Sequence, residues 1–295
     1  MSLDPRRVAA SFADAAAGYE QAARLQHVVE QELLARAEEL PLAPTVVLDL
    51  GAGTGRASAA LKQRFPKAEV IALDLALPML RVARQHQSWW RPFRRVNADV
   101  RALPIADASC DFLFSNLCLQ WIEQLGPVFA EFRRVLKPGG WLLFSSFGPD
   151  SLRELREAWA SVDDAPHVNV FLDMHDVGDA LLAQGFKDPM LDVERYQLGY
   201  DSALALMKEL KAIGAHNVDD GRRRGLTSRR ALNQVIAAYE AYRIDPTQVG
   251  ATYEIVFAQA QAPADGAPRR EQGKDIASVP LSRMRELIRK PRGGS

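Results

Sequence analysis

The segment that most constrains this chain is VVLDLGAGTG at positions 46–55. Its apolar, β-branched first half predicts a buried strand. Glycines at positions 51, 53 and 55 predict a loop whose backbone takes positive φ angles and lets a ligand approach closely. The acid Asp49 stands just before that loop. We therefore expect a strand that leads into a ligand-binding turn.

Between positions 45 and 146 the sequence alternates between strand-like and helix-like segments. This alternation predicts a parallel sheet covered by helices on both faces, with the ligand across the carboxyl ends of the first, second and fourth strands. The run Lys137-Pro138-Gly139-Gly140 predicts a tight turn that ends the third helix. The expected strands are 46–50, 70–73, 93–97, 112–115 and 141–146, and the expected helices are 56–64, 78–86 and 121–136.

Helical segments flank this core on both sides in the sequence. Residues 6–39 predict two helices broken near Gly18, with Phe12 and Tyr19 on one helical face. After the fifth strand we expect helices at 151–160, 176–184, 202–213 and 228–241, and strands at 191–198 and 252–258. The predicted fold is α/β, a doubly wound and mostly parallel seven-stranded sheet of Rossmann-like type, with N-terminal helices and a helical insertion before the last strand.

The expected domain organisation has five parts. They are an N-terminal helical lid at 1–44, an α/β core at 45–200 with an insertion near 150–172, a helical insertion at 201–247, the last core strand at 248–261 and a tail at 262–295. The tail is rich in Pro, Ala, Gly and charged residues, which predicts disorder with a short amphipathic helix near 282–289.

Composition excludes several classes of protein. The 295 residues are 47% hydrophobic and hold 37 basic and 37 acidic side chains, so no overall field attracts nucleic acid or a membrane. No apolar run approaches the length of a membrane span, and the N-terminus has no secretory signal pattern. The two cysteines, Cys110 and Cys118, lie in or beside apolar runs. We expect buried free thiols in a cytoplasmic protein.

Two further acids give the glycine loop a chemical meaning. Asp74 closes the second strand, 19 residues after Gly55, where a carboxylate accepts hydrogen bonds from both hydroxyls of a ribose. Asp99 ends the third strand, where an acid and a backbone amide can read adenine. A dinucleotide loop has the spacing G-x-G-x-x-G and no acid beside its pyrophosphate. The spacing found here, with Asp49 before it, favours a cationic ligand, S-adenosylmethionine, over NAD; a loop-bracing role for Asp49 remains the alternative.

These segments, together with Arg134-Val135-Leu136-Lys137-Pro138-Gly139-Gly140, resemble the class I S-adenosylmethionine-dependent methyltransferases over about residues 45–146. The resemblance implies that Asp49 and the glycine loop hold the methionine part, that Asp74 binds the ribose and that Asp99 with Val100 holds adenine. It implies no metal. The cofactor-binding residues expected on this basis are Asp49, Gly51, Ala52, Gly53, Asp74, Leu75, Met79, Asp99, Val100, Asn116 and Leu117.

A narrower resemblance covers residues 6 to about 260. The segments SNLCLQW at 115–121, HVNVF at 167–171 and LKAIGA at 210–215 look like those of the malonyl-acyl-carrier-protein O-methyltransferases, which start pimelate assembly for biotin. This resemblance implies methyl transfer from S-adenosylmethionine to the free carboxylate of a malonyl thioester, with S-adenosylhomocysteine as the second product. A carboxylate is already ionised at neutral pH, so we expect no general base.

The resemblance and the positions along the chain also give candidates for the substrate site. Tyr19 and Gln120 are expected to close the pocket. One cation is expected to orient the substrate carboxylate, and the candidates are Arg153, Arg156, His167 and Lys211.

A carrier protein is acidic, so its docking surface is expected to be basic. We expect it at Arg222, Arg223, Arg224, Arg229 and Arg230, with the aromatic and basic segment 89–95 as a second cluster. Two other functions remain open. One is a methyltransferase for another small acid or a quinone precursor, and the other is a methyltransferase-like assembly factor similar to those of mitochondrial complex I.

Overall fold

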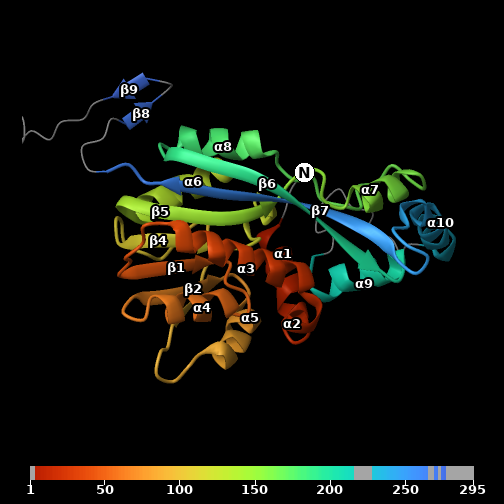
Figure 1. Ribbon diagram of the computed structural model, residues 1–295, viewed down its shortest axis with the longest axis horizontal. Coiled ribbons are helices and arrows are strands. Elements are labelled where there is room, and N and C mark those ends of the chain that lie inside the picture. Colours follow the sequence, from red (N-terminus) through yellow and green to blue (C-terminus); the bar gives the residue numbers. More distant parts are fainter. Residues whose placement is uncertain (1–3, 216–227, 265–268, 272–273, 277–295) are drawn as a thin grey trace, which may run out of the picture.

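The computed structural model describes residues 4–215, 228–264, 269–271 and 274–276. Their main feature is a seven-stranded sheet with the order β3-β2-β1-β4-β5-β7-β6 (Figure 1). The first five strands run parallel, and β7 and β6 are antiparallel to their neighbours. The strands are β1 Val46–Leu50, β2 Glu69–Asp74, β3 Arg94–Asn97, β4 Cys110–Ser115, β5 Leu136–Phe147, β6 Lys187–Tyr200 and β7 Val249–Gln261. This arrangement confirms the predicted α/β fold.

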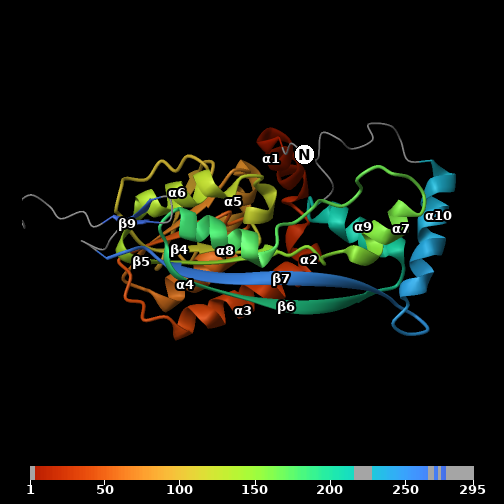
Figure 2. The same cartoon turned by 90° about the horizontal axis from the view of Figure 1, so that it is seen from above.

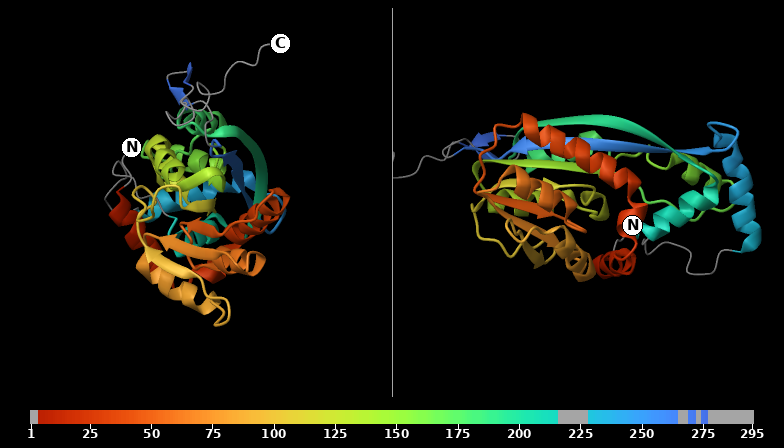
Figure 3. Two further views of the ribbon diagram at one scale, coloured as in Figure 1. Left: turned by 90° about the vertical axis from the view of Figure 1, so that its left-hand side faces the viewer. Right: turned by 60° about the horizontal axis from the view of Figure 1, so that its bottom comes forward.

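Helices cover both faces of the sheet because alternate side chains of each strand point to opposite faces. Val47 packs in one core cluster with Leu33 and Leu61, whereas Leu48 packs in the other with Phe129. Figure 3 shows α3 lying along the first of these faces. The helices are α1 Pro5–Ala15, α2 Tyr19–Ala22, α3 Arg24–Glu39, α4 Arg56–Arg64, α5 Leu77–Ala83, α6 Leu125–Val135, α7 Arg153–Ala160, α8 Met174–Ala183, α9 Ala203–Ala212 and α10 Arg229–Tyr239, with short 3-10 turns η1 Arg84–His86, η2 Leu119–Trp121 and η3 Glu240–Tyr242.

The N-terminal region differs from the expected pair of helices. It holds three, and Phe12 and Tyr19 belong to α1 and α2 and not to one helical face. Both aromatic side chains nevertheless pack against the same small cluster, which contains Ala76 and Met79. The break near Gly18 lets the chain turn so that both rings face the carboxyl end of the sheet.

The turn expected at 137–140 lies inside a strand. Helix α6 ends at Val135, and β5 begins at the next residue. The register of β4 against β5 shifts between Cys110 and Phe112, whose partners are Leu136 and Trp141. The extra residues form a bulge, with Gly139 at φ 76°. Helix α6 therefore stops where expected, but the strand that follows it, β5, begins earlier than the expected residue 141.

The last two strands reach beyond the core. The pairing of β6 with β7 runs from Lys187 opposite Gln261 to Tyr200 opposite Val249, whereas the pairing of β5 with β7 stops at Phe147 opposite Ile255. Figure 2 shows these strands running the length of the molecule, with α10 at one end. The projecting part of this ribbon carries α7, α9 and α10 and so creates a platform beside the carboxyl end of the sheet.

Within the described ranges, no helix has both the length and the apolar character needed to span a membrane. The expected tail falls largely outside the described residues, as does the short helix expected near 282–289. A pair of three-residue antiparallel strands, β8 Arg269–Glu271 and β9 Lys274–Ile276, is described within that stretch. The division into lid, core, insertion and tail remains a prediction.

Candidate functional site

The glycine loop follows β1 and curls over the end of β2. The backbone N–H groups of Gly51 and Ala52 both donate to the carbonyl of Leu73, at 2.8 and 2.9 Å. Gly51 and Gly53 have φ angles of 69° and 53°. A Cβ atom on Gly51 would lie 2.5 Å from the Cys118 Sγ, whereas one on Gly53 would meet nothing within 4 Å. Of these two glycines, Gly53 therefore has the open side that a ligand can approach.

A cavity with a volume of 110 Å³ opens over this loop. It lies at the carboxyl ends of β1, β2, β3 and β4, and the N-terminal helices cover it with Phe12 and Tyr19. We call it the loop cavity. Of the expected cofactor residues, those that line it are Gly51, Gly53, Asp74, Leu75, Met79, Asp99, Val100, Asn116 and Leu117.

Asp74 is the carboxylate of the loop cavity that two backbone N–H groups hold in place. Its two carboxylate oxygens accept hydrogen bonds from the backbone N–H groups of Gly53, at 2.8 Å, and Ala76, at 2.7 Å. Burial raises the pKa of this carboxyl, and the two N–H donors oppose that rise. The donors hold the carboxylate at the end of β2, where it has remaining lone pairs for a pair of sugar hydroxyls.

Asp99 has a partner that sequence reasoning missed. Arg101 lines the same cavity and donates from its backbone N–H and its Nε to Asp99 Oδ1, both at 2.9 Å, and its guanidinium also pairs with Oδ2. These hydrogen bonds lower the pKa of Asp99. An acid two residues before an arginine, just past a strand end, was the available sequence signal. The adenine contact of Asp99 remains a prediction.

Asp49 and Ala52 do not line the loop cavity. Asp49 is 1% exposed, and its Oδ2 accepts a hydrogen bond from the Ser58 hydroxyl of α4 at 2.5 Å. Burial raises its pKa to about 7, and the nearby Glu30 and Asp74 add to the rise. These contacts favour the loop-bracing role, and any contact with a ligand ammonium would have to be indirect.

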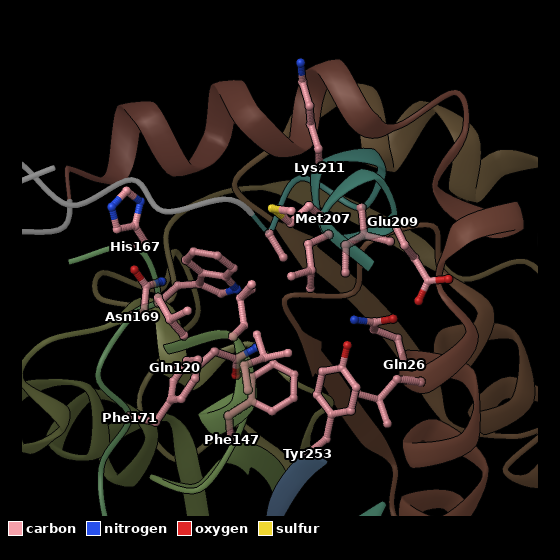
Figure 4. Close-up of a pocket in the computed structure, with 18 of the residues that line it drawn as sticks. Gln26, Gln120, Phe147, His167, Asn169, Phe171, Met207, Glu209, Lys211 and Tyr253 are labelled. Atoms are coloured by element: carbon pink, nitrogen blue, oxygen red, sulfur yellow. The ribbon is translucent and has the colours of Figure 1, made fainter. Parts of the chain in front are cut away.

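A second, larger cavity with a volume of 460 Å³ lies between the sheet and the projecting β6–β7 platform. Its lining is mainly apolar and includes Phe147, Trp159, Phe171 and Tyr253 (Figure 4). We call it the large cavity. Trp121 of η2 lines both cavities. The two spaces are therefore neighbours that share one aromatic wall.

Three of the predicted substrate residues line the large cavity, namely Gln120, His167 and Lys211. The His167 ring stacks on Trp159 with centroids 3.6 Å apart, and its Nε2 lies 2.8 Å from Asp163 Oδ1. Figure 4 shows the Lys211 side chain pointing away from the other labelled residues. Tyr19 lines the loop cavity instead, and burial raises its pKa well above the usual range.

Arg153 and Arg156 do not line the large cavity. The Arg156 guanidinium donates to the carbonyls of Pro149 and Ser151, each at 3.1 Å, and so holds the start of α7. Arg153 is half exposed and lies 3.5 Å from Glu154. Their position along the chain made these side chains candidates, but the local backbone engages Arg156 and a neighbouring acid lies near Arg153.

Sequence reasoning also missed several residues of the large cavity, among them Gln26, Phe147, Asn169 and Tyr253. In the segment between α7 and α8, His167, Val168, Asn169 and Phe171 line the cavity, whereas Val170 is 70% exposed. These lining residues follow no regular helix or strand period, so a search for such patterns does not single them out.

The N-terminal helices are tied to the glycine loop by one acid. Glu20 of α2 accepts a hydrogen bond from the Thr54 hydroxyl, and its carboxylate also lies 3.6 Å from Arg56 and 3.5 Å from His27. On the other side of the loop cavity, Phe12 meets the Trp121 ring edge to face at 5.3 Å. These contacts hold the helical cover over both cavities.

Comparison with known proteins identifies the family. A family model described as a methyltransferase domain matches residues 48–144. The malonyl-acyl-carrier protein O-methyltransferase of Xylella fastidiosa is 48% identical, over 95% of this chain and 95% of that protein. The protein of the same name from Laribacter hongkongensis is 47% identical, over 92% of this chain and 95% of that protein. The chain belongs to this family.

The chain is therefore an S-adenosylmethionine-dependent methyltransferase, and the prediction from the sequence is confirmed. The loop cavity fits this cofactor, because Gly53 has an open side and the Asp74 carboxylate lines the cavity. Ribose binding by Asp74 remains a prediction. Among the described residues, no group of three or more His, Cys, Asp or Glu side chains could hold a metal ion.

Solved structures show the same fold. The YcgJ protein of Bacillus subtilis matches with a TM-score of 0.58 at 16% identity, covering 79% of this methyltransferase and 98% of that chain. The cyclase SpnF matches with a TM-score of 0.50 at 21% identity, over 80% of this chain and 82% of that one. A cyclase with this fold shows that the fold alone does not decide the reaction.

The basic surface expected for docking is only partly described. Arg222, Arg223 and Arg224 lie outside the described residues. Arg229 and Arg230 begin α10 and are exposed, at the end of the molecule that the β6–β7 platform forms (Figure 1). In the second cluster, Trp89 and Trp90 are also exposed, and their rings lie 3.4 Å apart.

Proposed function

We propose that this methyltransferase transfers the methyl group of S-adenosylmethionine to the free carboxylate of malonyl-acyl-carrier protein, an early step of biotin biosynthesis. The observation that carries the proposal is the large cavity, which adjoins the loop cavity at Trp121. The relatives of Xylella fastidiosa and Laribacter hongkongensis support it by their names and their near-complete coverage of the chain.

The cofactor supplies an electrophilic methyl group on a sulfonium. The residues of the loop cavity would hold it in three places. Gly53 would lie against the methionine part, Asp74 would accept from the ribose hydroxyls, and Asp99 with Val100 would hold the adenine. The position of Tyr19 in the loop cavity supports a role in covering the cofactor. Gln120 lies at the large cavity and would cover the substrate.

The protein needs no general base for this reaction, because the attacking carboxylate is ionised at neutral pH. Its residues must instead align the carboxylate and remove water from it. The aromatic lining of the large cavity, including Phe147 and Trp159, suits both tasks. Trp121 stands where the two cavities meet and would set the approach of the carboxylate to the methyl group.

The direct test is mass spectrometry of malonyl-acyl-carrier protein after incubation with purified enzyme and S-adenosylmethionine. The proposal predicts a gain of one methyl mass, and alkali should release that methyl as methanol, as expected of an ester. Acetyl-acyl-carrier protein, which has no free carboxylate, is the matched control and should gain nothing. Failure of the malonyl protein to gain the methyl would reject this substrate, and a labelled methyl found only on carbon or nitrogen would reject carboxyl methylation.

The docking of the carrier protein has its own test. Reversing Arg222, Arg223 and Arg224 to Glu should lower kcat/KM for malonyl-acyl-carrier protein by about tenfold or more, because the partner is acidic. Turnover of malonyl-CoA should change little, since it has no protein surface to dock. The exposed Lys67 in the loop before β2 offers a charge-reversal control. Equal losses on both substrates would contradict docking at these arginines.

A further inference from the structure

Several polar groups around the large cavity already have protein partners. Glu209 accepts from Arg24 at 3.0 Å and from the Tyr200 hydroxyl at 2.8 Å. The Tyr253 hydroxyl lies 3.0 Å from that of Tyr200, and His167 is engaged by Asp163. These groups are held within the cavity wall.

Asn169 differs from them. It is only 7% exposed and lines the large cavity, and its Oδ1 is buried without a hydrogen-bond partner. Its Nδ2 donates to no residue that the structure describes and, unlike Oδ1, is not fully buried, so in the assigned orientation of the carboxamide Nδ2 is the atom open to a ligand. Gln120 lines the same cavity with its Oε1 unpartnered, although its Nε2 donates to the Leu117 carbonyl at 2.6 Å.

A buried carboxamide with no hydrogen bond destabilises a folded chain, because it has left water without replacing the bonds it made there. Replacing it by an apolar side chain of similar size would make the folded chain more stable. Groups of this kind that face a cavity are candidates for ligand contacts.

We infer that Asn169 positions the substrate, with its Nδ2 donating a hydrogen bond to the free carboxylate of the malonyl thioester. The inference rests on the proposed function and adds a residue to it. Gln120 then offers its free Oε1 to an N–H group of the arm that carries the thioester.

A neutral amide suits this reaction better than a cation does. The carboxylate loses its negative charge as the ester forms, so a cation beside it would stabilise the reactant more than the transition state. An amide N–H orients the oxygen with less of this penalty. Three of the four cations expected from the sequence agree with this, because Lys211 points away from the other labelled side chains in Figure 4 and neither Arg153 nor Arg156 lines the large cavity. His167 lines the large cavity, and its Nε2 lies 2.8 Å from Asp163 Oδ1.

The test compares Asn169→Leu, which keeps the shape, with Asn169→Asp, which adds a charge. Asn169→Leu should lower kcat/KM for malonyl-acyl-carrier protein by about 10- to 100-fold, the usual effect of losing one hydrogen bond to a charged group. Asn169→Asp should lower it further through repulsion between like charges. The dissociation constant of S-adenosylmethionine should stay unchanged. The inhibition constant of acetyl-acyl-carrier protein, measured as a competitor of the malonyl protein, should also stay unchanged.

The melting temperature separates this role from a structural one. Asn169→Leu should melt at the wild-type temperature or above it, because it removes an unsatisfied polar group. Val170→Ala, on the exposed neighbour, is the matched control and should keep full activity. A wild-type kcat/KM in Asn169→Leu, a smaller loss in Asn169→Asp than in Asn169→Leu, or a fall in melting temperature in both variants would overturn the role of Asn169 alone. Absence of malonyl methylation by the wild-type enzyme would reject the proposed function together with it.

Discussion

Replacing Asp49 by Asn should change how the stability of the cofactor-free enzyme depends on pH. Burial raises the pKa of Asp49 from 3.8 to about 7 in the folded chain. Because the folded pKa lies above the unfolded one, protonation of Asp49 contributes stability that is complete below the unfolded pKa and is lost as the pH rises through about 7. Asn keeps an oxygen that can accept from the Ser58 hydroxyl and does not titrate.

The size of this change in stability follows from the shift in the pKa of Asp49. A pH of about 5 is about two units below the pKa of Asp49 in the folded chain. Each unit corresponds to about 1.4 kcal/mol of unfolding free energy. Between about pH 5 and about pH 8 the wild type should therefore lose about 3 kcal/mol of unfolding free energy through Asp49. For a chain of this size the loss corresponds to about 6 °C in melting temperature.

The measurement is urea unfolding of the two proteins across this pH range, with the difference between them isolating Asp49. Glu30, whose pKa burial raises to about 7, titrates in the same range. Its contribution remains in Asp49→Asn, and Glu30→Gln is the matched control. Equal slopes of unfolding free energy against pH in wild type and Asp49→Asn would refute the reasoning. If Asp49 also senses the cofactor ammonium, S-adenosylmethionine should bind the wild type more tightly as the pH rises through about 7, and Asp49→Asn should show no such rise.

Two further predictions concern the loop and the shared wall. Gly51→Ala combines a positive φ with a Cβ atom 2.5 Å from the Cys118 Sγ, so it should lower the unfolding free energy by about 2 kcal/mol or more. Gly53→Ala has the same kind of positive-φ strain but meets no protein atom within 4 Å, so it should lose less stability than Gly51→Ala and should also weaken S-adenosylmethionine binding in calorimetry. The reverse order of stability losses would contradict the geometry. Trp121→Ala removes the wall that both cavities share and the contact with Phe12, so the cofactor dissociation constant and the KM for the malonyl thioester should both rise about tenfold. A rise in only one of them would show that the two cavities work independently.

Local patterns account for the part of the molecule that could be predicted. The bounds of β1 and α4 agree with those expected, because the apolar run and the glycines that follow it determine where the strand stops and the helix starts. Asp74 lies at the end of β2 for the same reason. The short break at Gly18 was visible, but the separation of Phe12 from Tyr19 into different helices was not, because it depends on packing against Ala76 and Met79.

Residues of the large cavity were harder to predict because they come from distant segments. Gln26, Gln120, Asn169 and Tyr253 meet only after the sheet is assembled. Position along the chain and charge made Arg156 a candidate, but its guanidinium donates to two backbone carbonyls of the neighbouring loop. Sequence position could not show that engagement.

The sequence alone determined the doubly wound sheet, the glycine loop and the class of the cofactor. Each depends on residues within a few positions of one another, where the spacing of apolar side chains, glycines and acids sets the local conformation. The tertiary structure decided which space lies beside the loop. The β6–β7 ribbon extends past the core, Trp121 joins two cavities, and Asn169 is buried without a partner. These features arise from contacts between segments far apart in the chain, which no local pattern encodes.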